Sequence, residues 1–188
     1  MYKYFINSVN ITKYIIENYV KEGHRVLDCT VGNGNDTLNL AKSVGNKGKV
    51  YGFDIQSVAL EITADKLRSN GLEDRVILIK DSHEYINKYI FEELDLIIYN
   101  LGYLPGGDKS IKTNSSTTIK SIEKALNLLK SNGLLLITSY TGHKGGEEEK
   151  EKIESYLESL DQKYVNVLEF SFINQKNNPP ILYGVEKI

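Results

Sequence analysis

The sequence lacks several features that would assign it to large classes of protein. It has one cysteine, Cys29, among 188 residues, which excludes an internal disulfide and leaves no cysteine cluster for a metal ion. No apolar run approaches the roughly 20 residues that span a bilayer. The first residues also lack the apolar core and cleavage site of a secretory signal. These absences favour a cytoplasmic protein with no membrane segment and no metal.

A large excess of either charge is also missing. The 23 Lys and Arg residues nearly balance 25 Asp and Glu residues, giving a net charge of −2. A nucleic-acid substrate would therefore have to be held by a local basic patch. The length suits one domain with a full-sized core. We expect residues 1–188 to form that domain, with residues 1–22 packing on it as an N-terminal helical segment.

Strand-like apolar segments alternate with helical ones along the chain. We expect strands at residues 24–29, 49–54, 75–80, 94–100, 134–140, 164–174 and 181–187. We expect helices at residues 8–19, 36–44, 57–70, 83–89, 115–130 and 147–160. This alternation predicts an α/β fold with a largely parallel sheet and helices on both faces. The last two strands are joined by a short Pro-containing connection and should form an antiparallel hairpin.

The segment after the first strand holds the strongest candidates for a ligand site, because ligands of open α/β sheets bind at the carboxyl ends of strands. Gly32 and Gly34 let the chain turn tightly and approach a ligand. A Gly-x-Gly pair is equally typical of an ordinary strand-to-helix turn. The third glycine of the dinucleotide motif is absent, since Thr37 occupies its position.

Acidic residues flank this turn and bear on the identity of the ligand. A pyrophosphate at the helix N-terminus would meet Asp36 as a like charge, which disfavours NAD. S-adenosylmethionine (SAM) instead carries a sulfonium and an ammonium group, which acidic side chains favour. We expect Asp28 to act on the amino-acid part of SAM directly or through water. Asp36 either contributes to the same site or serves only as a helix N-cap.

Two later segments supply candidates for the rest of this ligand. Asp54 follows Gly34 by about twenty residues, the spacing at which an acid accepts hydrogen bonds from a ribose diol, and Gln56 shares its edge. Asp81 and Ser82 follow the third strand, where they either bind adenine or cap the next helix. His83 is adjacent, although such a histidine is more often a packing or surface residue.

The loop after the fourth strand should face the methyl donor. Asn100 offers a side-chain oxygen to an amine, and Tyr103 offers a ring that could flank a flat substrate. The alternative is a flexible surface loop. Other candidates at this edge are His143, a rigid Pro-containing turn at residues 178–180 near the substrate rim, and a weak cationic patch of Lys109, Lys112 and Lys144.

Several of these segments, taken in order, resemble one known family. The segments are Asp28-x-Thr30-x-Gly32-Asn33-Gly34-x-Asp36-Thr37, Gly52-Phe53-Asp54-Ile55-Gln56, Asn100-Leu101-Gly102-Tyr103-Leu104-Pro105-Gly106-Gly107-Asp108-Lys109 and Gly142-His143-x-Gly145-Gly146. Nearly the whole chain resembles the small bacterial class I methyltransferases long labelled putative rRNA methylases. The resemblance implies a seven-stranded Rossmann-like domain with the last strand antiparallel. It also implies SAM as methyl donor, and the 5-aminomethyl(-2-thio)uridine at wobble position 34 of the tRNA anticodon arm as acceptor.

The candidate residues fall into two sets. The cofactor set is Asp28, Thr30, Gly32, Asn33, Gly34, Asp36, Thr37, Asp54, Gln56, Asp81, Ser82, His83, Asn100 and Gly102. The catalytic set is Asn100, Tyr103, Asp108 and His143. Asn100 would orient the amine lone pair, while Asp108 or His143 would relay the proton that the amine must lose.

Four other functions remain open at this point. The acceptor could be a small molecule or rRNA on the same fold, or the protein could bind SAM without catalysis. An NAD-dependent oxidoreductase is disfavoured by the missing glycine and by Asp36. A homodimer is a further possibility, because a domain of this size has little surface with which to span an anticodon arm.

Overall fold

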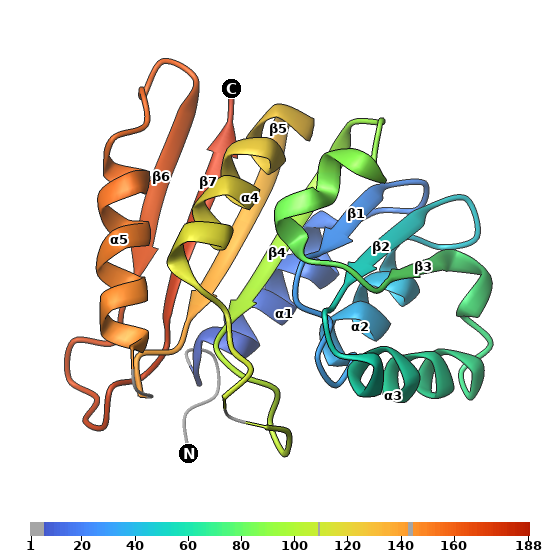
Figure 1. Cartoon of the computed structure of the whole chain (residues 1–188). Helices are drawn as coiled ribbons and strands as arrows, with labels where there is room; N and C mark the ends of the chain where they lie inside the picture. The colour runs from blue at the N-terminus through green and yellow to red at the C-terminus, as the bar shows by residue number, and fades with distance from the viewer. Residues whose placement is uncertain (1–5, 109, 143–144) are drawn as a thin grey trace.

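A computed structural model describes residues 6–108, 110–142 and 145–188. A seven-stranded sheet runs through it in the order β3-β2-β1-β4-β5-β7-β6 (Figure 1). The strands are β1 (Arg25–Asp28), β2 (Lys49–Phe53), β3 (Val76–Ile79), β4 (Leu94–Leu101), β5 (Leu129–Ser139), β6 (Val165–Phe170) and β7 (Ile181–Lys187). β7 is antiparallel to both of its neighbours, and the other pairings are parallel. The predicted α/β Rossmann-like architecture is confirmed.

Helices cover both faces of the sheet (Figure 1). Helices α1 (Ser8–Tyr19), α2 (Asn35–Ser43) and α3 (Ser57–Arg68) lie on one face, where Ile16, Leu40 and Leu67 enter one buried core. On the other face, the 3₁₀ helix η2 (His83–Lys88), α4 (Ser115–Leu128) and α5 (Gly146–Glu158) bury Ile86, Ile122 and Ile153 in a second core. A short 3₁₀ turn, η1 (Glu73–Arg75), precedes β3. None of the described helices has the length and apolar character needed to cross a membrane.

The structure differs from the predicted boundaries mainly around β5. The helix before it ends at Leu128, and β5 already begins at Leu129 rather than at residue 134. Leu129 pairs with Leu94, and the register of the β4–β5 pairing shifts between Leu94 and Leu96. Within β5, Asn132 has a left-handed φ of 62°. Asn132 and Gly133, a pair that commonly ends helices, therefore lie within a strand.

Helix α1 packs tightly on the rest of the fold. Ile16 is fully buried, and Tyr19 donates a hydrogen bond to the carbonyl of Asn132 at 2.7 Å. At the other end of the helix, the Ser8 hydroxyl donates to the carbonyl of Pro180, which precedes β7. The start of α1 is thereby held at the edge of the sheet where the carboxyl ends of the parallel strands meet.

Candidate active site

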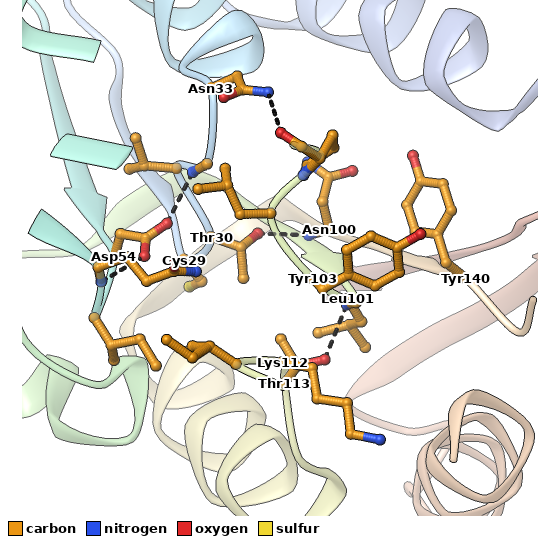
Figure 2. A pocket seen from close by; sticks show the side chains of 18 of the residues that line it. Cys29, Thr30, Asn33, Asp54, Asn100, Leu101, Tyr103, Lys112, Thr113 and Tyr140 are labelled. Carbon is orange, nitrogen blue, oxygen red and sulfur yellow. Dashed lines mark hydrogen bonds between the residues drawn. The ribbon is translucent and has the colours of Figure 1, made fainter. Parts of the chain in front are cut away.

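A cavity of about 730 Å³ opens at the carboxyl ends of β1, β2, β4 and β5. In Figure 2, Asp54 lies at one end of this pocket and Tyr140 at the other, with Thr30 and Asn100 between them. The strand order reverses between β1 and β4, so the pocket occupies the switch point at which doubly wound sheets bind ligands.

The turn after β1 forms the floor of the pocket. Gly34 adopts a left-handed conformation with φ of 71° and is the N-cap of α2. The Thr30 hydroxyl accepts a hydrogen bond from the backbone N–H of Asn100 at 2.7 Å, which joins this turn to β4. From α3, the Lys66 ammonium donates to the carbonyl of Asn33 at 2.6 Å. Neighbouring elements thus fix the turn on both sides.

Asp28 supports this turn from beneath. Its side chain is fully buried, accepting from the Thr37 hydroxyl at 2.7 Å and from the Thr30 N–H at 3.1 Å. Burial, and secondarily the nearby Asp36 charge, raise the pKa of Asp28 to about 7. Asp28, Gly34 and Thr37 are absent from the lining of the cavity. These contacts favour the water-mediated or indirect form of the role expected for Asp28.

Asp54 is placed at the end of β2 and lines the cavity. One carboxylate oxygen accepts from the Gly32 N–H and the other from the Gln56 N–H, both at 2.9 Å. Each oxygen of a carboxylate has a second lone pair, so Asp54 can still accept from two hydroxyl groups of a ligand. This arrangement fits the ribose diol of SAM.

The residues after β3 form the adjacent wall. Asp81 accepts from the Tyr89 hydroxyl and from the Ser82 N–H, each at 2.7 Å, and the Ser82 hydroxyl caps η2. His83 is buried against Tyr99 in an edge-to-face contact, and burial lowers its pKa to about 4. The cap role of Ser82 is therefore present, and all three residues of this segment, Asp81 to His83, also line the cavity.

Asn100 and Asp36 meet on the acceptor side of the pocket. The Asn100 side-chain amide donates to Asp36 Oδ2 at 2.9 Å, which directs its Oδ1 away from that carboxylate. Gly34 is the N-cap of α2, so the alternative that Asp36 only caps the helix is wrong. Burial raises the pKa of Asp36, and burial, together with the smaller effect of the Asp36 charge, raises the pKa of Tyr140.

The loop after β4 closes over this region. Tyr103 and Lys112 form an isolated antiparallel bridge, and the Gly102 N–H donates to the Thr113 hydroxyl at 2.9 Å. Thr113 in turn donates to the buried carboxylate of Glu149 on α5 at 2.8 Å. These contacts tie both ends of the loop to the fold, with α5 holding its Thr113 end.

Asp108 does not have the position that a proton relay requires. It is an exposed turn residue whose carboxylate accepts from the Ser110 N–H at 2.8 Å, which lowers its pKa. It is absent from the cavity lining, so the structure does not bring it together with Asn100. The other candidate relay, His143, lies outside the described residues, as do Lys109 and Lys144 of the weak cationic patch.

Most of the other candidates do line the cavity. They are Thr30, Gly32, Asn33, Asp36, Asp54, Gln56, Asp81, Ser82, His83, Asn100, Gly102 and Tyr103. Sequence reasoning missed the contributions of Val9, Ile111, Thr113, Thr117 and Tyr140. Val9 carried no local signal, since the packing of α1 alone brings it there. Tyr140 could have been found, because it directly follows a strand that ends at this edge. Asn178 and Pro180 also line the cavity, which agrees with the turn expected near the substrate rim.

These features define a class of protein. A glycine turn after β1, an acid after β2 and a polar loop after β4, on a sheet whose last strand is antiparallel, are the features of a class I SAM-dependent methyltransferase. The described residues contain no group of three or more His, Cys, Asp or Glu side chains that could hold a metal ion.

The comparison with known proteins identifies the family. The chain belongs to the family described as Putative rRNA methylase, which matches residues 50–186. A crystal structure of a putative rRNA-methylase from Clostridium thermocellum is 47% identical, with a TM-score of 0.96 and 100% of both chains covered. A putative methyltransferase from Streptococcus mutans, solved in complex with SAH, is 35% identical, with a TM-score of 0.89 and 100% of both chains covered.

A relative with a specific name is also similar. The chloroplastic tRNA (mnm(5)s(2)U34)-methyltransferase of Arabidopsis thaliana is 34% identical over 186 residues, covering 94% of this chain and 68% of that protein. The family, this relative and the SAH complex together show that the protein is a SAM-dependent methyltransferase.

Proposed function

We propose that this methyltransferase acts on tRNA, at the aminomethyl nitrogen of 5-aminomethyl(-2-thio)uridine in wobble position 34. The observation that carries the proposal is the fixed orientation of Asn100, whose amide group donates to Asp36 at 2.9 Å. This bond leaves the Asn100 side-chain oxygen available to accept a hydrogen bond from an amine. The Arabidopsis relative named for the same nucleoside supports this choice of acceptor.

The surroundings of Asn100 suit a flat base that carries an amine. Figure 2 shows Tyr103 and Tyr140 on the same side of the pocket as Asn100. Unpaired bases of RNA are commonly bound by stacking on aromatic rings. Either tyrosine ring can provide such a surface while Asn100 receives the aminomethyl group.

The remaining residues of the pocket fit SAM. Asp54 would bind the ribose hydroxyls, and the segment Asp81 to His83 would border the adenine. Asp36 gives the centre of the pocket a negative charge, which attracts a cationic ligand. When bound, SAM supplies an electrophilic methyl group. The protein then has to align the amine nitrogen with that group and exclude water from both, which are large contributions to transfer reactions.

Labelled methyl transfer tests this function. Purified protein and methyl-labelled SAM are incubated with tRNA from a strain lacking this gene, and the digested nucleosides are examined by mass spectrometry. Conversion of 5-aminomethyl to 5-methylaminomethyl nucleosides is the expected result. If the protein binds SAM but the tRNA receives no label, the proposed acceptor is wrong.

Other acceptors on the same fold are distinguished by parallel reactions. Ribosomal RNA from the same strain tests the rRNA alternative, and a panel of small amines tests the metabolite alternative. SAM binding without turnover on any acceptor would point to a non-catalytic SAM-binding protein. The assembly state, for which a homodimer is proposed, is measured by light scattering during size exclusion.

A further inference from the structure

The proposed reaction requires a proton acceptor inside the pocket. An aliphatic amine has a pKa near that of lysine, about 10.4, so only about one molecule in a thousand is neutral near pH 7.5. The protonated amine has no lone pair with which to attack a methyl group. Asp108, one candidate for this role, is an exposed turn residue outside the cavity.

We infer that Asp36 is the group that takes this proton. Asp36 lines the cavity, and its Oδ2 accepts from the same Asn100 amide that orients the acceptor nitrogen. Among the described residues, its Oδ1 has no hydrogen-bond partner and is not one of the buried unsatisfied atoms. An amine that donates to Asn100 Oδ1 is separated from Asp36 by one amide group, and Asp36 Oδ1 is still able to accept a proton.

Among the described residues, the groups that neighbour Asp36 are less well placed to accept this proton. Asp28, from β1, is fully buried, accepts from the Thr30 N–H and the Thr37 hydroxyl, and is absent from the cavity lining, so it does not meet an amine in the pocket. Asp54, from β2, already receives two backbone N–H groups. Tyr140, which follows β5, has a raised pKa and stays neutral at physiological pH. Burial also raises the pKa of Asp36, which strengthens it as a base.

One proton and one methyl group are transferred in this step. The protonated amine gives one proton to Asp36 Oδ1, and the freed lone pair on nitrogen forms the new N–C bond. The C–S bond breaks, and its electron pair remains on sulfur. The products are a protonated secondary amine and S-adenosylhomocysteine, and the proton on Asp36 later passes to solvent. This assignment rests on the proposed function, because it presupposes an amine acceptor.

The test compares Asp36→Asn with the wild-type protein in single-turnover reactions at saturating SAM and tRNA, from pH 6 to pH 9. The asparagine can still accept from the Asn100 amide, so the pocket geometry is kept while the base is lost. We expect the rate at pH 7 to fall by at least about 100-fold, the usual contribution of a general base. The deficit should shrink toward pH 9, where solvent supplies more of the neutral amine. The Kd for SAM should weaken only several-fold, through the lost negative charge, which is far less than the loss of rate.

Two further variants complete the experiment. Asp36→Glu retains a carboxylate and should recover part of the rate at pH 7, which tests the role even if the asparagine variant folds poorly. Asp74→Asn makes the same chemical change in the exposed turn η1 and should behave as wild type.

Several outcomes would overturn the inference. A tenfold weaker Kd for SAM at unchanged rate would show that Asp36 binds the cofactor instead. A rate loss of equal size at every pH would show that Asp36 only positions Asn100. If the wild-type protein bound SAM but transferred no methyl group to tRNA, the proposed acceptor would be wrong. The role of Asp36, which presupposes that acceptor, would then be wrong as well.

Discussion

Hydrogen bonds hold both the main chain and the side chain of Asn100 in place. Its N–H donates to Thr30 and its side-chain amide to Asp36, so its oxygen has one direction available. We predict that Asn100→Ala lowers kcat by about 100-fold, because a misaligned acceptor loses that much in transfer reactions. Single-turnover kinetics together with SAM titration measure this. Unchanged turnover with intact SAM binding would remove Asn100 from the mechanism, and Asn87→Ala on the exposed part of η2 is the control.

The stability of the protein should depend on pH through Asp28. Its pKa is about 7 in the folded protein and about 3.9 when exposed, so the folded state holds this proton more tightly. The stability linked to this proton is complete below about pH 4 and is lost as the pH rises to about 7. We predict that Asp28→Asn, which cannot ionise, is more stable than wild type at pH 8, by up to about 4 kcal/mol.

Urea unfolding at pH 5 and pH 8 measures this difference. The advantage of Asp28→Asn should be clearly smaller at pH 5, where the wild-type carboxyl is largely protonated. An equal difference at both values would show that the buried carboxyl is not responsible. Asp74→Asn should show no such dependence on pH.

At the residue level the sequence predicted chemical types better than contacts. Asp54, directly after β2, and Asn100, near the end of β4, both line the cavity as predicted. The sequence could not separate Asp28 from Asp36, because both flank the same glycine turn. Only the folded structure shows that Asp28 points beneath the turn and Asp36 toward Asn100.

Among the elements, the β1–α2 turn depends most strictly on a glycine. A Cβ atom at Gly34 would lie 2.4 Å from the Thr63 hydroxyl of α3, and the φ of +71° is itself unfavourable for other residues. We predict that Gly34→Ala destabilises the protein by about 1–3 kcal/mol and weakens SAM binding. Thermal unfolding and SAM titration measure the two effects.

A second substitution separates the two causes. Adding Thr63→Ala removes the hydroxyl and methyl groups that an alanine at position 34 would meet most closely. It should restore part of the stability, leaving the cost of the backbone conformation. No recovery in the double variant would attribute the whole loss to the backbone.

Sequence patterns predicted the elements but not all of their boundaries. The alternation of apolar segments correctly predicted the order and type of the strands. The early start of β5 was missed because Asn-Gly commonly ends helices, whereas here Leu129 is recruited into the sheet by pairing with Leu94. Such pairing depends on a partner about 35 residues away in sequence, which no local pattern contains.

For the molecule as a whole, a net charge of −2 means that tRNA binding must rely on local cations. Lys112 lines the cavity and is held by the bridge to Tyr103. We predict that Lys112→Ala raises the KM for tRNA several-fold and lowers the slope of log KM against log salt by about 1. Methyl transfer at a series of salt concentrations measures both.

Lys47→Ala provides the matched control. Lys47 is exposed in the connection that leads into the amino end of β2, at the opposite edge of the sheet from the pocket. Its loss should leave the KM for tRNA and the salt slope unchanged. Equal effects of the two substitutions would mean that tRNA responds to total charge and not to Lys112.

The position of β7 has a consequence for how the chain is made. β7 is the last strand in sequence, yet it lies between β5 and β6 and pairs with both. While the ribosome is still synthesising the segment before it, β5 has an open edge and β6 has no partner in the sheet. Asn178 and Pro180, which line the cavity, directly precede β7. β7 therefore both fills the gap between β5 and β6 and brings the residues just before it to the wall of the active site, so a nascent chain gains this substrate pocket only after β7 has been made.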